Sequence, residues 1–255
     1  MALVKTDDEI EKIRRGGRIL ATILAEIAEQ AKPGVTTKDL DAFAVERIKH
    51  YGVKSSFKGY DAGGSKPFPA VLCTSVNEEV VHVIPSDRVL KDGDIIGLDF
   101  GIWSEGLCTD TAVTVAVGKA SKMAQRLITT TRDAMMAGIE QVKPGNHIGD
   151  ISAAIQAAIE PEKFGIVREL VGHGVGHEVH EPPQIPNYGK KGTGQVLKKN
   201  MVLAIEPIVN EGDIRIAHSD NGWDIVTYDR KLSAHFEHTV IVTDTGFEIV
   251  TVTDI

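Results

Sequence analysis

The sequence predicts an α+β fold made of two similar halves. Two helical periodicities followed by strand-like segments occur near the N-terminus, and the same order of elements returns later in the chain. Setting Lys32-Pro33-Gly34 on Lys143-Pro144-Gly145 gives an offset of 111 residues (143 minus 32), which also matches Leu40 to Ile151. A chance match of common helix-ending residues is the alternative. The recurring order favours two halves packed around a pseudo-twofold axis, with a cleft where they meet.

Four helices follow from the apolar spacings and from the residues at their ends. The first begins after a capping box formed by Thr6 and Glu9, and the second stops before Gly52. Their expected extents are about 7 to 32, 36 or 37 to 51, 121 to 142, and 148 to just before Gly165. The halves themselves are expected at about 1–117 and 118–255.

The segment 93–117 predicts a β-hairpin that carries two acids. Apolar residues alternate along its first strand and leave Asp99 on the other face, while 107–117 forms the second strand. A two-residue turn at Ser104 and Glu105 would set Asp99 directly opposite Asp110. Two carboxylates about 5 Å apart would repel by roughly 3 kcal/mol at an effective dielectric near 20. A bound cation or a shared proton would offset this repulsion, whereas another register would leave both acids facing water.

Three further segments place acids and imidazoles among residues that should be buried. Three histidines lie among glycines in 172–181, and the single glutamates Glu206 and Glu237 belong to otherwise apolar runs. A buried, unpaired glutamate costs several kcal/mol, so each needs a cation or a proton. An internal salt bridge could serve either glutamate, but lysine and arginine are sparse in these segments. Four carboxylates with at least one imidazole suit two divalent first-row ions bridged by carboxylates.

Composition excludes several classes of protein. The 255 residues are 42% hydrophobic, enough for a sizeable core, and the net charge of −8 argues against a general nucleic-acid surface. Cys73 and Cys108 are the two cysteines, which form no disulfide framework and suit a reducing compartment. No apolar signal core or membrane-spanning run occurs, so we expect a cytoplasmic protein.

These motifs resemble those of the type I methionine aminopeptidases of peptidase family M24, which share the pita-bread fold with X-Pro aminopeptidases, prolidases and creatinase. The resemblance covers essentially the whole chain, and its segments are 57–60, 74–82, the hairpin of Asp99 and Asp110, 172–174, 180–181, 204–207 and 236–239. It implies a single catalytic domain, 1–255, in which a curved antiparallel sheet is covered by helices.

The resemblance also implies roles for individual residues. Asp99 would bind one metal ion, His173 and Glu206 the other, and two further acids would bridge both. The implied metal ligands are Asp99, Asp110, His173, Glu206 and Glu237. The implied catalytic residues are His82, His180 and Glu206, with Glu206 relaying a proton. The implied substrate-binding residues are His82, His180, Phe57, Tyr60, Cys73 and Trp223.

The implied activity is that of a methionyl aminopeptidase, a metalloexopeptidase that removes the N-terminal methionine from nascent proteins when the second residue is small. Two divalent ions per chain are implied, and cobalt, manganese, iron and zinc all suit such ligands. Expected partners are peptide and nascent-protein N-termini, with the ribosome as a further candidate. We expect a monomer that has no direct nucleic-acid site and binds no membrane.

Two alternatives lie within the same fold. An X-Pro aminopeptidase or prolidase-like peptidase would show arginine-rich recognition and an extra domain, and neither is seen in the sequence. A metal-free binding protein would typically have lost metal ligands, and all five are retained here. The chain departs from the family pattern at 61–69, where a long Gly/Ser/Pro segment suggests a mobile loop, and at Val179, where an aromatic residue is usual.

Overall fold

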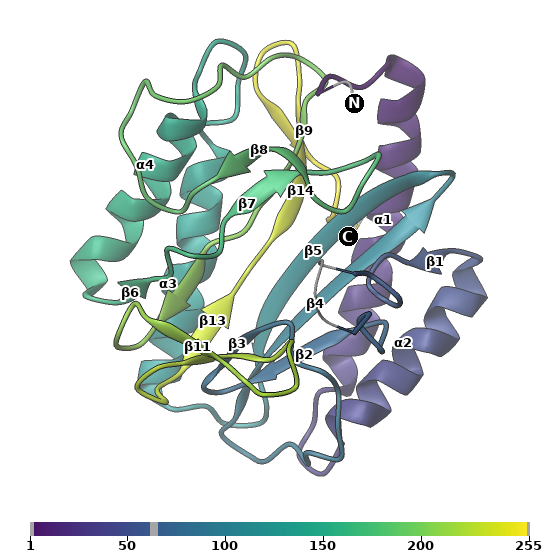
Figure 1. Cartoon of the computed structure of the whole chain (residues 1–255), viewed down its shortest axis with the longest axis vertical. Helices are drawn as coiled ribbons and strands as arrows, with labels where there is room; N and C mark the ends of the chain where they lie inside the picture. Colours follow the sequence, from purple (N-terminus) through teal and green to yellow (C-terminus); the bar gives the residue numbers. More distant parts are fainter. Residues whose placement is uncertain (1–2, 62–65, 254–255) are drawn as a thin grey trace.

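The computed structural model, which describes residues 3–61 and 66–253, places two pairs of helices on either side of a set of strands (Figure 1). The helices are α1 (Asp7–Gln30), α2 (Thr37–Tyr51), α3 (Lys122–Ile139) and α4 (Ile148–Ile159), followed by the 3-10 turn η1 (Glu160–Glu162). The strands are β1 (Lys54–Ser55), β2 (Cys73–Val76), β3 (Glu79–Val81), β4 (Ile95–Ser104), β5 (Leu107–Ala116), β6 (Gly165–Ile166), β7 (Gly172–Gly174), β8 (Glu181–Ile185), β9 (Val202–Ile205), β10 (Ile208–Asn210), β11 (Ile216–His218), β12 (Ile225–Thr227), β13 (Ser233–His235), β14 (His238–Val242) and β15 (Phe247–Ile249).

All strand pairs in the described residues are antiparallel. The long hairpin β4–β5 dominates the first half, and a five-stranded sheet in the order β15-β14-β9-β7-β8 dominates the second. The two meet at an isolated bridge, in which Glu237 N–H donates to Ala112 O at 2.9 Å and Ala112 N–H donates to Glu237 O at 3.2 Å. This bridge brings the acid of one half beside the acids of the other.

The predicted helices are confirmed, and the N-termini of α2 and α4 repeat the offset found in the sequence. At α2, Thr36 N–H donates to Asp39 at 2.9 Å, and at α4, His147 N–H donates to Asp150 at 2.7 Å. The capping box of Thr6 with α1 is also present. α1, α3 and α4 end a little earlier than expected, because the chain leaves the helix before each Lys-Pro-Gly segment and because α4 passes into the 3-10 turn η1.

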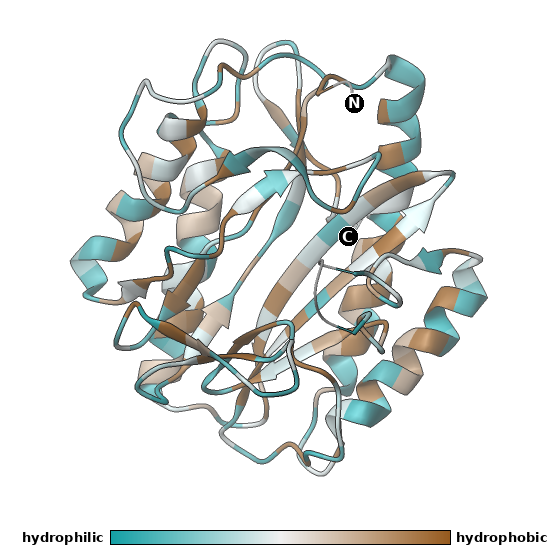
Figure 2. Cartoon of the chain, viewed as in Figure 1, coloured by the Kyte–Doolittle hydropathy of each residue, from teal (hydrophilic) through white to brown (hydrophobic). Residues whose placement is uncertain are grey.

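Each helix pair buries its apolar face against its own strands. One core cluster joins α1 and α2 to β4, and another joins α3 and α4 to β9 and β14. Figure 2 shows brown and teal residues on each of the four helices, as amphipathic helices on a sheet require. None of the helices in the described residues combines the length and the apolar character that a membrane crossing needs.

The predicted register of the β4–β5 hairpin is wrong by two residues. The turn residues are Glu105 and Gly106, both with positive φ (50° and 84°), so Ser104 pairs with Leu107. This primed turn matches the twist of the strands and places glycine at one of its two left-handed positions. Asp110 therefore lies opposite Gly101 instead of Asp99. A shift of two residues keeps both acids on the same face, now as diagonal neighbours.

Candidate metal centre

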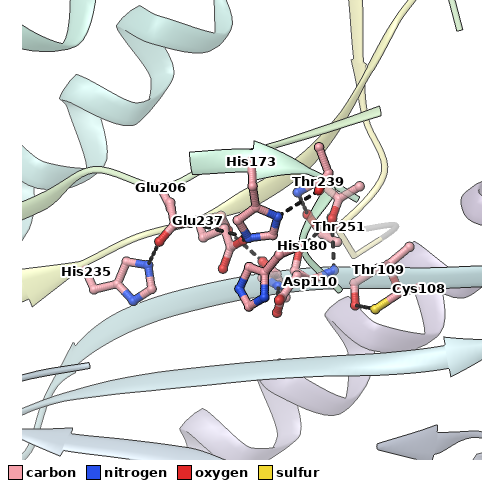
Figure 3. A network of polar contacts seen from close by, with 12 residues as sticks. Cys108, Thr109, Asp110, His173, His180, Glu206, His235, Glu237, Thr239 and Thr251 are labelled. Carbon is pink, nitrogen blue, oxygen red and sulfur yellow. Dashed lines mark hydrogen bonds and ion pairs between the residues drawn. The ribbon is translucent and has the colours of Figure 1, made fainter. Parts of the chain in front are cut away.

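The five predicted metal ligands come from both halves of the chain and line one cavity of about 350 Å³. Asp99 and Asp110 lie on the neighbouring strands β4 and β5, and His173 lies on β7. Glu206 follows β9 directly, and Glu237 occupies the gap between β13 and β14. Figure 3 shows Asp110, His173, Glu206 and Glu237 with their side chains gathered in one place.

The tightest group is Asp110, His173 and Glu237, whose ligand atoms all lie within 4.8 Å of one another. His173 Nε2 is also 3.4 Å from Glu206 Oε1. The other ring nitrogen, Nδ1, lies 2.9 Å from Gly174 O, a carbonyl that can only accept, so Nδ1 carries the proton. This contact leaves the lone pair of Nε2 directed toward the acids, which is the arrangement of a metal-binding imidazole.

The acids of this centre are buried, and no lysine or arginine of the described residues forms an ion pair with them. Asp99, Asp110 and Glu237 are 9%, 3% and 2% exposed. Asp99 Oδ1 and Glu237 Oε1 have no hydrogen-bond partner among the described residues. The ion pairs that Glu206 and Glu237 form there are with His173 and His235, and none is with a lysine or arginine. Carboxylate oxygens without partners at this depth fit divalent cations.

Burial and mutual repulsion shift the pKa values of these groups. Burial raises the pKa of Asp99 to about 7, and burial with the neighbouring acids raises the pKa values of Asp110 and Glu237 well above their usual range. Burial also acts upward on the pKa of Glu206, but His235 and His173 outweigh it and hold that pKa below its ordinary value. Glu206 is thus the acid of the group most readily ionised.

His235, which was not among the predicted site residues, contacts the carboxylate of Glu206. His235, at the end of β13, is buried, and its Nε2 lies 3.5 Å from Glu206 Oε2. Alternation along 233–237 places it on the same face as Glu237, which is the pattern that could have identified it. An imidazole at this position can orient the carboxylate of Glu206, which is itself a predicted metal ligand.

The other end of the cavity is apolar and aromatic. Phe57, Tyr60 and Trp223 line it, and Cys73 lies between them and the acids, because Cys73 pairs with Asp99 across β2 and β4. Phe68 packs edge-on against Trp223 with ring centroids 5.2 Å apart, and Trp223 Nε1–H donates to Lys66 O at 2.7 Å. Residues that were not among the predicted site residues also line the cavity, namely Phe68, Leu170, His218, Gly222 and Ile225.

Phe68 of the 61–69 segment thus belongs to the cavity wall, whereas residues 62–65 of the loop predicted to be mobile lie outside the described residues. Val179, the predicted departure from the family pattern, is buried in the same wall. A valine fills less space than an aromatic ring, so the cavity is wider at this point than an aromatic would leave it.

His82 and His180 lie between the acids and the apolar end. The ring of His180 is 4.4 Å from that of His173 between centroids, and its Nδ1 forms a 2.7 Å hydrogen bond with Tyr60 Oη. The ring of His82 lies 6.4 Å from that of Trp223. Burial lowers the pKa of each histidine to about 4, so both imidazoles are neutral at neutral pH. Neutral imidazoles can donate one hydrogen bond and accept another.

Comparison with known proteins supports the metal centre. Residues 11–244 match the model of metallopeptidase family M24. The chain is 47% identical over 252 residues to a methionine aminopeptidase of Clostridium acetobutylicum and 46% identical over 251 residues to methionine aminopeptidase 1 of Bacillus subtilis, covering 98% of this chain and 99% of each relative.

Solved structures agree. The crystal structure of a methionine aminopeptidase from Thermotoga maritima superimposes with a TM-score of 0.94 at 44% identity, covering 98% of both chains. A prolidase from Pyrococcus horikoshii shares the fold with a TM-score of 0.77 at 21% identity, and the match covers 99% of this chain but 64% of the prolidase. The predicted pita-bread fold is therefore confirmed, and the chain belongs to metallopeptidase family M24, among its type I methionine aminopeptidases.

Proposed function

We propose that this chain removes the N-terminal methionine from peptides and nascent proteins whose second residue is small, in a metal-dependent reaction. The observation that carries this proposal is a single cavity with buried, cation-free carboxylates at one end and an aromatic, apolar wall at the other. The first end suits metal-assisted hydrolysis, and the second suits an unbranched apolar side chain such as methionine.

The metal centre would hold two divalent ions. Asp99 would bind one ion, His173 and Glu206 the other, and Asp110 and Glu237 would bridge them. Cobalt, manganese, iron and zinc all suit four carboxylates and one imidazole. When bound, such ions anchor the free amino group of the substrate, polarise its carbonyl and lower the pKa of water from 15.7 to about 7.

The chain's own side chains would carry the remaining steps. Glu206, the acid most readily ionised, accepts a proton from the attacking water and passes it to the leaving amine as the peptide bond breaks. His180 donates to the oxygen on which negative charge develops, and His82 contacts the scissile amide nitrogen. The products are free methionine and a chain shorter by one residue.

The apolar end of the cavity would set specificity. Phe57, Tyr60, Cys73 and Trp223 surround the methionine side chain in this proposal, and the free amino group must reach the metal centre. Acylated N-termini should therefore be refused. A second residue that is large would meet the crowded acids and imidazoles, which explains the preference for a small one.

The proposal extends to the organisation and setting of the enzyme. The repeated helix pairs and their separate core clusters support one catalytic domain, 1–255, with pseudo-symmetric halves at about 1–117 and 118–255. We place its work in the cytoplasm, as a monomer that meets nascent chains, with the ribosome as a candidate partner.

The test is a panel of peptides assayed in one buffer with added manganese or cobalt. Met-Ala-Ser should release methionine rapidly, whereas formyl-Met-Ala-Ser, Met-Leu-Ser and Arg-Pro-Pro should not. Cleavage of Arg-Pro-Pro with none of Met-Ala-Ser would replace this proposal by the X-Pro alternative. Elemental analysis of the same preparation should find up to two transition-metal ions per chain. A chain that binds none under these conditions would support a metal-free binding protein.

A further inference from the structure

A buried ion pair joins the start of the chain to the loop that carries His180. Lys5 Nζ lies 2.6 Å from Glu181 Oε2, and the two side chains are 1% and 4% exposed. Lys5 precedes the first helix, and Glu181 follows His180 directly. A lysine this deeply buried is unusual, because removing its charge from water is costly unless a partner compensates it.

The second oxygen of Glu181 holds the loop itself. Glu181 Oε1 accepts from the backbone N–H of His177 and from that of Glu178, the latter at 3.0 Å. Residues 175–180 lie between β7 and β8 and belong to no strand, so no sheet ladder fixes their conformation. The carboxylate of Glu181 therefore replaces the missing ladder, and Lys5 fixes that carboxylate.

The surroundings of Lys5 are shaped for this contact. Gly176 has φ +141°, and a Cβ there would lie 2.5 Å from Lys5 Cε, so the absence of a side chain at this position lets the lysine pass. Lys5 N–H donates to Asn200 O at 2.9 Å, which anchors its backbone. Lys5 Nζ also lies 3.3 Å from His177 Nδ1, and His177 Nε2 lies 2.6 Å from Glu9 Oε1 on α1.

The loop ends at the catalytic side of the cavity. The ring of His180 fits between Tyr60, to which it is hydrogen-bonded, and His173 of the metal centre. The other end of the loop is tied to the hairpin, because Cys108 N–H donates to Gly176 O at 2.7 Å. A displacement of the loop would therefore move the imidazole relative to the acids.

We propose that Lys5 and Glu181 are positioning residues, which lock the loop 175–181 so that His180 meets the substrate oxygen. This inference rests on the proposed function of His180. The segment before α1 therefore helps to position His180, although Lys5 does not line the cavity. Neither residue touches the substrate in this proposal.

The test compares Lys5→Met, which keeps the aliphatic length and removes the charge, with the wild type. Hydrogen exchange of the amides of His177 and Glu178 should become at least about tenfold faster. For Met-Ala-Ser, kcat should fall by about 10- to 100-fold with KM nearly unchanged, since misplacing a group by about 1 Å costs up to about 10²-fold. Metal content should stay at the wild-type level.

The matched control is Lys12→Met. Lys12 pairs with Asp8 on the exposed surface of α1, so this change removes a lysine from the same region without touching the loop. Exchange, kcat and metal content should all equal those of the wild type. If Lys5→Met also left loop exchange and kcat unchanged, the proposal would be overturned.

A double variant separates positioning from folding. Lys5→Met leaves the carboxylate of Glu181 buried without its cation, which should lower the denaturation midpoint. Lys5→Met/Glu181→Gln removes that unpaired charge and keeps a carbonyl oxygen for the two loop amides, so the midpoint should return toward that of the wild type. The tether to residue 5 stays broken, so kcat should remain at least about fivefold low. Full recovery of kcat would show that Lys5 only neutralises Glu181, contrary to the proposal. A wild type inactive on Met-Ala-Ser would sink the proposed function, while loop exchange would still report whether Lys5 locks the loop.

Discussion

Two groups of buried acids in this molecule are balanced in opposite ways. Glu181 faces the ammonium group of Lys5 and two backbone N–H groups, so the fold itself compensates its charge. Asp99, Asp110 and Glu237 face one another and the imidazole of His173, and two of their oxygens have no hydrogen-bond partner among the described residues. The first group is complete without a ligand, and the second is not.

The difference shows that Glu181 is arranged for stability, whereas the acids of the metal centre are arranged for binding a cation. A sequence that can bury Lys5 to balance one acid could in principle do the same for others, since compensation lowers the cost of burial. At the metal centre no cationic side chain offsets the repulsion between the carboxylates. A bound divalent cation would offset it. The acids there are therefore expected to destabilise the metal-free protein and to stabilise the metal-bound one.

The largest expected effect comes from Asp110→Ala. Asp110 belongs to the tightest ligand group and would bridge both ions, so its loss should weaken metal binding and lower kcat by more than the ~10²–10³-fold that removing one stabilising donor costs. Elemental analysis and steady-state assays measure both. Metal content equal to that of the wild type would contradict the assignment.

An intermediate effect is expected on the stability of the metal-free protein, where replacing Asp110 should stabilise the fold. Burial raises the pKa of Asp110, so the folded state favours its neutral form, and stability is lost as pH rises from the unfolded value near 4 through the folded one. Asp110→Asn removes this loss and keeps an oxygen for the N–H of Thr111. Each pKa unit is worth about 1.4 kcal/mol.

The measurement is urea unfolding of metal-stripped wild type and Asp110→Asn between pH 5 and pH 8. The variant should be the more stable, increasingly so with pH, and adding a divalent ion should reverse the order because the wild type binds it better. The histidines whose pKa burial lowers, His82, His180 and His238, favour folding as pH rises to about 6.5, but they contribute equally to both proteins. A metal-free variant less stable than the wild type at pH 8 would refute the idea that this centre is strained by its own charge.

The smallest effect is expected at the apolar end of the cavity. Cys73→Ser places a hydroxyl where a buried thiol packs beside Trp223, at a cost of roughly 1 kcal/mol, or about fivefold in KM for methionyl peptides. Metal content should not change. A loss of metal in this variant would show that the two ends of the cavity are not independent.

Local features could be predicted from the sequence because they depend on residues a few positions apart. The capping pair of Thr6 with Glu9 and the approximate extents of the helices follow from short-range hydrogen bonds and apolar spacing. Glu206 and Glu237 could be identified because each lies in an apolar run, and Asp99 and Asp110 because a hairpin brings them close together. Their shared cavity is consistent with that prediction.

The sequence by itself thus determined the four helices, the family and the five candidate metal ligands that share one cavity. Only the tertiary structure decided the register of the hairpin, which places Asp110 opposite Gly101, and the contact of His235 with Glu206. It alone paired Lys5 with Glu181, which lie 176 positions apart. Such contacts depend on how strands and loops pack across the whole chain, and no local propensity specifies which distant side chain fills a given buried space.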